Sequence, residues 1–147
     1  MFPTHLSLKS RRALILALWA ALIGSVIIGS LSPAASPVVA AVGLLHVNDK
    51  VMHFCAYLAL SVLPVIGFKH RRKGIVAGLS MFVLGVLMEV GQHFSPGRAV
   101  ELGDVVANGI GVGCGMSCAL LIVAVGRRVS PCRETPQAER PLRQGIG

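Results

Sequence analysis

The chain has 147 residues, of which 54% are hydrophobic and only 14% are charged, and its mean hydropathy is +0.73. A water-soluble domain carries about 25% charged residues, so this composition argues against a soluble enzyme. The net charge of +8 does not indicate nucleic-acid binding, because the basic residues form short clusters beside apolar blocks without interleaved aromatic residues. We therefore expect an integral membrane protein with no nucleic-acid partner.

The first apolar block, residues 13–31, contains 19 uncharged residues and follows Lys9, Arg11 and Arg12. At about 1.5 Å per residue, a helix of this length crosses a hydrocarbon core of roughly 30 Å. A cleavable signal peptide has the same polarity, but its apolar core is usually only about 7 to 15 residues long. The block predicts an uncleaved first span, preceded by a cytoplasmic N-terminus of residues 1–12.

The next segment, residues 32–48, contains Pro33 and Pro37 and then an apolar run that is too short to cross a membrane. We expect a loop with a turn or short helix at the membrane interface. A second span is predicted from about residue 51 to residue 68, where the basic cluster of residues 69–73 ends it.

Two further apolar blocks, residues 74–92 and 105–125, predict the third and fourth spans, joined by a polar loop. The predicted fold is therefore all-α, with a four-helix transmembrane domain over residues 13–128. The remaining residues, 129–147, contain three prolines and little apolar content, which is typical of a disordered tail.

The distribution of basic residues predicts the orientation of these spans. If the N-terminus is cytoplasmic, twelve of the 14 Lys and Arg residues lie on the cytoplasmic side, and only Lys50 and Arg98 lie outside. Such an asymmetry over short loops determines topology, so we expect four spans with both termini in the cytoplasm.

Polar side chains gather at the outer ends of the last three spans, and many recur at a spacing of four residues, on one helix face. The candidate site consists of eight of them: Asp49, Lys50, His53, Glu89, Gln92, Arg98, Asp104 and Asn108. A structural plug would need only one or two ion pairs, whereas so many polar groups at one depth predict a cavity open to the outer surface.

Glu89 lies about one turn inside its span, where an ionised side chain facing lipid would be costly. We expect it to face protein, water or a positive partner such as Arg98, Lys50 or His53. Pro96 and Gly97 predict a tight turn that brings Arg98 back over the helix ends.

The fourth span contains small residues at four-residue spacing on two adjacent faces, which favours close helix packing and a possible homo-oligomer. These residues are Gly109, Gly111, Gly113 and Gly115. A glycine-rich phosphate loop is not expected inside a membrane span, because such loops join a strand to a helix. We expect no cofactor.

The polar pattern closely resembles that of the VanZ-like family of small bacterial membrane proteins. The resemblance rests on Asp49-Lys50-x-x-His53-Phe54-x-x-Tyr57, then Glu89-x-x-Gln92, Arg98, Asp104-x-x-x-Asn108 and Gly111, over about residues 45–125. It leaves the first span and the tail outside. It implies a bundle of four or more membrane helices whose polar residues correspond to the candidate site.

Several functions remain open from the sequence. The first is a site for the headgroup of a membrane lipid or lipid-linked envelope precursor, in which Lys50 and Arg98 meet an anionic group. The second is an enzyme acting on such a lipid through His53 or His93 and a carboxylate, although no nucleophile is evident. A metal site from Asp49, His53, Glu89 and His93 and a scaffold or transporter are further alternatives.

Overall fold

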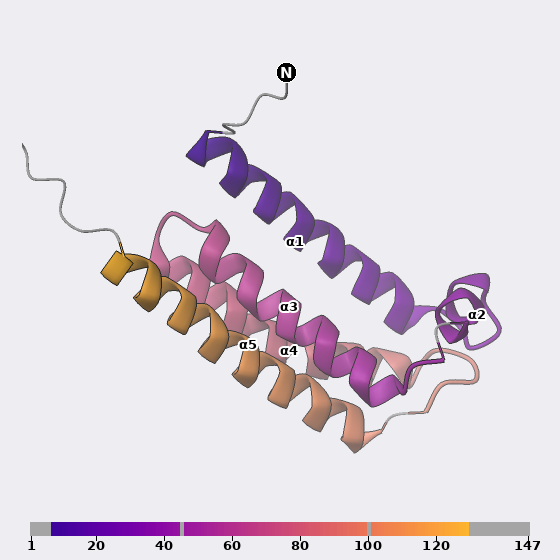
Figure 1. Cartoon of the computed structure of the whole chain (residues 1–147). Coiled ribbons are helices and arrows are strands. Elements are labelled where there is room, and N and C mark those ends of the chain that lie inside the picture. Colours follow the sequence, from indigo (N-terminus) through magenta and orange to yellow (C-terminus); the bar gives the residue numbers. More distant parts are fainter. Residues whose placement is uncertain (1–6, 45, 100, 130–147) are drawn as a thin grey trace, which may run out of the picture.

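The computed structural model describes residues 7–44, 46–99 and 101–129, and the regular secondary structure of these residues is entirely helical. The helices are α1 (Leu8–Leu31), α2 (Pro37–Gly43), α3 (Asp49–Gly67), α4 (Arg71–Gln92) and α5 (Leu102–Val129). All except α2 are long and apolar enough to cross a membrane. The predicted all-α bundle of four membrane helices is therefore confirmed (Figure 1).

The first and last helices extend beyond the apolar blocks that predicted them. α1 begins at Leu8, where the Ser7 hydroxyl caps it by accepting the N–H of Ser10 at 3.2 Å. The basic residues assigned to a separate N-terminal segment are helical, since Lys and Arg are good helix formers. α5 likewise continues to Val129. The predicted disordered tail falls, beyond Val129, outside the described residues.

The short interfacial helix expected between the first two spans is present as α2. Ser36 caps it by accepting the N–H of Val39 at 3.3 Å, and Pro37 occupies the first helical turn, where its missing N–H is not needed. In Figure 1, α2 lies beyond the end of α1 and close to the start of α3.

α3 is the central helix of the bundle, with its most extensive contacts to α5, then to α4 and α1. Around it lies the hydrophobic core, formed by Tyr57, Leu60, Val65, Met81, Val112, Met116 and Ala119. Large apolar side chains on the outer faces of the helices are exposed, as lipid contact requires.

Small residues allow α5 to approach α3 closely. A Cβ atom added to Gly111 would lie 2.5 Å from the carbonyl oxygen of Phe54, and one added to Gly115 would lie 2.5 Å from that of Leu58. The predicted close packing therefore occurs, and it occurs within the chain. Gly113, by contrast, has no neighbour within 4 Å of such a Cβ among the described residues, so oligomerisation through this face stays a prediction.

A proline in α3 explains how α1 is attached. Pro64 has no N–H, so the carbonyl of Leu60, one turn earlier, lacks its usual partner within the helix. The indole of Trp19 donates to this carbonyl at 2.9 Å. The Trp19 ring also meets Phe68 edge to face, with centroids 5.9 Å apart. A backbone group freed by proline thus becomes an anchor between two helices in lipid, where no water could satisfy it.

The two ends of the bundle differ in chemistry. Three basic segments lie together at one end: the start of α1, the α3–α4 connection and the final turn of α5 (Figure 1). α2 and the α4–α5 connection lie at the other end.

We predict that a reporter active only in the cytoplasm gives a signal when fused after Lys73 or at the C-terminus, and none when fused near Pro37 or Pro96. The reason is that basic segments are retained in the cytoplasm during insertion. A signal from the Pro96 fusion would show that the bundle is inserted the other way round.

Candidate functional site

The polar residues predicted from the sequence meet where α3 and α5 begin and α4 ends (Figure 1). Six of them are linked by direct contacts, and we call them the polar cluster: Asp49, Lys50, His53, Glu89, Asp104 and Asn108. α3 and α5 run parallel to each other and antiparallel to α4, so the first turns of α3 and α5 lie beside the last turns of α4.

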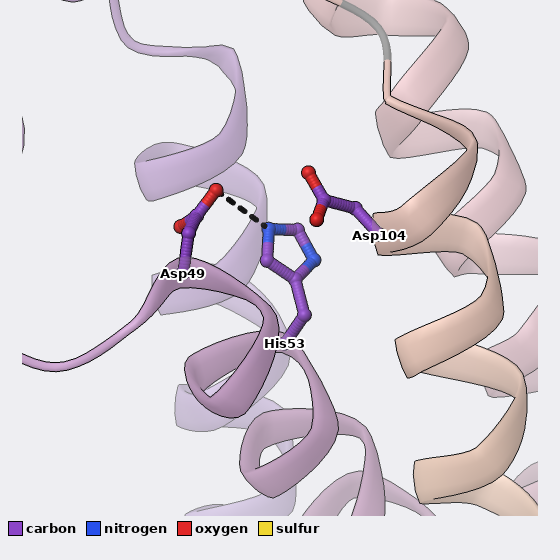
Figure 2. Close-up of side chains that lie close together, drawn as sticks. All are labelled: Asp49, His53 and Asp104. Atoms are coloured by element: carbon purple, nitrogen blue, oxygen red, sulfur yellow. Dashed lines mark ion pairs between the residues drawn. The ribbon is translucent and has the colours of Figure 1, made fainter.

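His53 is the centre of the polar cluster. Its Nδ1 atom lies 3.0 Å from Oδ1 of Asn108 and 3.8 Å from Oε1 of Glu89. Its Nε2 atom lies 3.9 Å from Oδ2 of Asp49, one helical turn earlier. Figure 2 shows the ring between the carboxylates of Asp49 on α3 and Asp104 on α5. One imidazole therefore connects three helices.

Glu89 faces the protein interior rather than lipid, with only 1% of its surface exposed. Its ion-pair partner is His53, yet neither carboxylate oxygen has a hydrogen-bond partner among the described residues. Buried carboxylates are usually hydrogen bonded, so this arrangement is a departure that invites a functional explanation.

Lys50 reaches from α3 to the start of α5. Its ammonium group lies 2.6 Å from Glu101 and 3.6 Å from Asp104. The hydrogen bond from Lys50 to Glu101, assisted by the charge of Lys50, lowers the pKa of this exposed carboxyl below its ordinary value. Since Glu101 and Lys50 are both about half exposed, this pair contributes little to stability.

Arg98 lies on another side of the bundle end. The expected turn exists, with Gly97 in the left-handed region at φ 75°, but it leads Arg98 to α1. The backbone N–H of Ala34 donates to the carbonyl of Pro96 at 3.2 Å, which ties this loop to the segment after α1. Arg98 then donates from Nη2 to the carbonyl of Gly29 at 2.9 Å. In the described part of the chain, the ion pairs of the polar cluster involve Lys50 and His53, not Arg98.

A pocket of about 380 Å³ lies next to Arg98, between α1, α2 and α3. Its polar wall contains Asp49, His53, Gln92 and Arg98. Its apolar wall contains valines from α1, from α2 and from the connection between α2 and α3, among them Val26, Val39 and Val47.

The structure thus separates the eight predicted residues into two overlapping groups. Lys50, Glu89, Asp104 and Asn108 belong to the polar cluster and do not line the pocket, whereas Gln92 and Arg98 line the pocket alone. Asp49 and His53 belong to both groups, so they join the cluster to the pocket. The eight residues do not surround a single cavity.

A family model described as VanZ/LLP1 matches residues 8–123. The chain belongs to this family. The match includes α1 as well as the polar pattern, so the resemblance from the sequence, which started near residue 45, was too narrow. The chain matches no curated protein and no solved structure.

The site predicted from the sequence of this VanZ/LLP1 protein left out several residues that line the pocket. Gly29 and Ser30 of α1 and Val39 of α2 line the pocket, although the sequence predicted only an uncleaved first span and an interfacial turn or short helix for these segments. A spacing of small residues in the first span was the only available signal. Tyr57 lines the pocket too, with a buried hydroxyl that has no hydrogen-bond partner within the described segments. Tyr57 follows Asp49 and His53 at the same four-residue spacing, on one helix face, and this spacing could have indicated its position.

Proposed function

We propose that this VanZ-like membrane protein binds the phosphate-bearing headgroup of a lipid, either a phospholipid or a lipid-linked envelope precursor, in the pocket beside Arg98. The observation that carries the proposal is the state of this guanidinium. Arg98 lines the pocket, and the carbonyl of Gly29 holds its Nη2 atom in place at 2.9 Å. A pre-oriented guanidinium in a pocket wall is well suited to a phosphate group.

The composition of the pocket supports an amphipathic ligand. Val26, Val39 and Met52 provide an apolar surface next to the polar wall that holds Arg98. A lipid has the matching arrangement, with apolar acyl chains next to a polar headgroup. Asp49 lines the polar wall as well, and its half-exposed carboxylate provides a partner for headgroups that carry an amine.

The position of the pocket supports the same ligand. It lies at the end of the bundle opposite the basic segments, next to the short helix α2. With the basic segments in the cytoplasm, the pocket lies at the outer face of the bacterial plasma membrane, at the depth of the headgroups.

A second candidate function is acid–base catalysis on the bound lipid. It is favoured by His53, which lines the pocket and is flanked by Asp49 and Glu89, since carboxylates orient catalytic imidazoles. Ser95, the hydroxyl at the start of the α4–α5 connection, donates to the carbonyl of Leu31 at 2.9 Å and does not line the pocket. In this candidate mechanism water is the nucleophile.

The test is mass spectrometry of lipids that co-purify with the full-length protein in mild detergent. Arg98→Gln, which keeps a donor for Gly29 but removes the charge, is expected to lower bound anionic lipid about tenfold. The matched control, Arg72→Ala, removes an exposed arginine at the opposite end of the bundle and leaves the lipid in place.

The lipid masses distinguish a phospholipid from a lipid-linked precursor. Equal amounts of lipid on the wild type and on Arg98→Gln would refute the binding site. Conversion of added lipid by the wild type, lost in His53→Gln, would favour the enzyme instead.

A further inference from the structure

The polar cluster contains a group of potential metal ligands that the lipid pocket does not explain. One oxygen of Asp49, one oxygen of Asp104 and one ring nitrogen of His53 all lie within 4.8 Å of one another (Figure 2). Sequence analysis named His93 and Glu89 as the partners of Asp49 and His53 in a metal site. In the structure His93 is exposed beyond the end of α4, with its ring against Phe94, and Asp104 takes its place.

Hydrogen bonding determines which nitrogen of His53 can act as a ligand. Nδ1 lies 3.0 Å from the side-chain oxygen of Asn108, and an amide oxygen only accepts. Nδ1 therefore donates, and the neutral ring carries its lone pair on Nε2. Nε2 is the nitrogen that faces Asp49 at 3.9 Å. Metal-binding histidines characteristically donate their other N–H to an oxygen in this way.

Two buried carboxylates beside His53 supply a second, independent observation. Asp104 is 3% exposed, and its Oδ1 atom is buried without a hydrogen-bond partner in the described part of the chain, with the ammonium of Lys50 at the longer distance of 3.6 Å. Glu89 is 1% exposed, and both of its carboxylate oxygens are buried without a hydrogen-bond partner among the described residues. A bound cation would compensate buried carboxylates of this kind, since desolvation penalises an unpaired ion by several kcal/mol.

Lys50 does not supply enough positive charge for these carboxylates. Its ammonium lies nearer to the exposed Glu101, at 2.6 Å, than to Asp104, at 3.6 Å. Lys50 is shared between Glu101 and Asp104. Among the described residues, the ion-pair partner of Asp49 and of Glu89 is His53.

We propose that Asp49, His53 and Asp104 bind a divalent transition-metal ion, for which Zn²⁺ is the best match. Zinc accepts imidazole nitrogen and carboxylate oxygen at about 2.0–2.2 Å, and sites with three protein ligands keep a fourth position for water or another ligand. Ligand atoms of such a site lie about 3.3 Å apart, so the group must contract. Asp49 can provide the movement because its side chain is 56% exposed.

Each remaining residue of the cluster has a role in this site. Asn108 orients His53, and Glu89, 3.8 Å from Nδ1, adds negative charge outside the ligand set. The site goes beyond the lipid proposal and does not depend on it. Asp49 and His53 also line the pocket, so a metal ion held by them would lie beside the pocket.

The experiment is equilibrium dialysis of the detergent-purified, full-length protein against Zn²⁺, followed by elemental mass spectrometry. The wild type is expected to retain one Zn²⁺ per chain. Asp104→Asn and Asp49→Asn are each expected to weaken binding about tenfold or more. The matched control is Glu101→Gln, which removes an exposed carboxylate on the same lysine and leaves binding unchanged.

Two further measurements keep the outcome decisive. Circular dichroism shows whether each variant is folded, and Asp49→Asn alters an exposed side chain, so the proposal does not depend on tolerance of the buried Asp104 substitution. The absorption spectrum with Co²⁺ in place of Zn²⁺ reports coordination at a defined site. A wild type that retains no metal, or equal losses in Glu101→Gln and the two asparagine variants, would overturn the site.

The metal and lipid proposals fail separately. Arg98→Gln is expected to lose lipid and keep Zn²⁺, because Arg98 lies outside the polar cluster. Asp104→Asn is expected to lose Zn²⁺ and to keep the lipid, because Asp104 does not line the pocket.

Discussion

Replacing Gly115 with leucine is expected to prevent stable folding of the bundle. Even a Cβ atom at this position would lie 2.5 Å from the carbonyl oxygen of Leu58 and against the hydroxyl of Ser61. The first obstacle is backbone, which cannot rotate away, so α3 and α5 would have to separate along their contact. We expect a loss of more than about 3 kcal/mol in the free energy of unfolding. Thermal unfolding in detergent, followed by circular dichroism, measures it.

The matched control is Gly113→Leu on the same helix. Gly113 is exposed and a side chain there meets no described residue within 4 Å, so the same substitution should leave the fold intact. Replacing a helical glycine should even add up to about 1 kcal/mol of stability. Equal destabilisation by both variants would mean that the α3–α5 contact is not what Gly115 provides. A smaller oligomer in Gly113→Leu would support association of copies through this face.

Replacing Glu89 with glutamine is expected to stabilise the protein by about 2 kcal/mol, because removal of an intramembrane charge removes its desolvation penalty. The substitution preserves the shape of a side chain that is 1% exposed and whose two oxygens have no hydrogen-bond partner among the described residues. Thermal unfolding of the two proteins side by side measures the difference.

The comparison variant is Glu101→Gln, in which the lost carboxylate is exposed and paired with Lys50. Its stability should change little, since exposed ion pairs contribute about 1 kcal/mol or less. If Glu89→Gln is less stable than the wild type, the Glu89 carboxylate must be paired more strongly than its 3.8 Å approach to His53 indicates. Greater stability together with weaker Zn²⁺ binding would show that Glu89 serves the site at the expense of the fold.

Packing and site are connected through α1. The anchor of Trp19 on the Leu60 carbonyl holds α1 against α3, and the carbonyl of Gly29 near the end of α1 in turn holds Arg98. Pro64, by freeing the Leu60 carbonyl, thus takes part in shaping a pocket at the other end of the bundle.

Hydropathy and residue spacing were sufficient to predict an integral membrane protein, its four spans and the short helix between the first two. They also predicted that Glu89 faces the protein and that the glycines of the last span permit close packing. These properties depend on hydropathy over a known thickness and on helical periodicity, both of which are local along the chain.

Which side chains meet could not be predicted without the packing of the helices against one another. Periodicity places His53 and Asp104 on helix faces, but it does not say that Asp104, rather than His93, completes the group around the imidazole. Nor does it say that Arg98 turns toward Gly29 of α1 and away from the carboxylates. The angular position of each helix relative to its neighbours depends on interhelical packing, such as that of Gly111 and Gly115 against α3, and this is a property of two segments together.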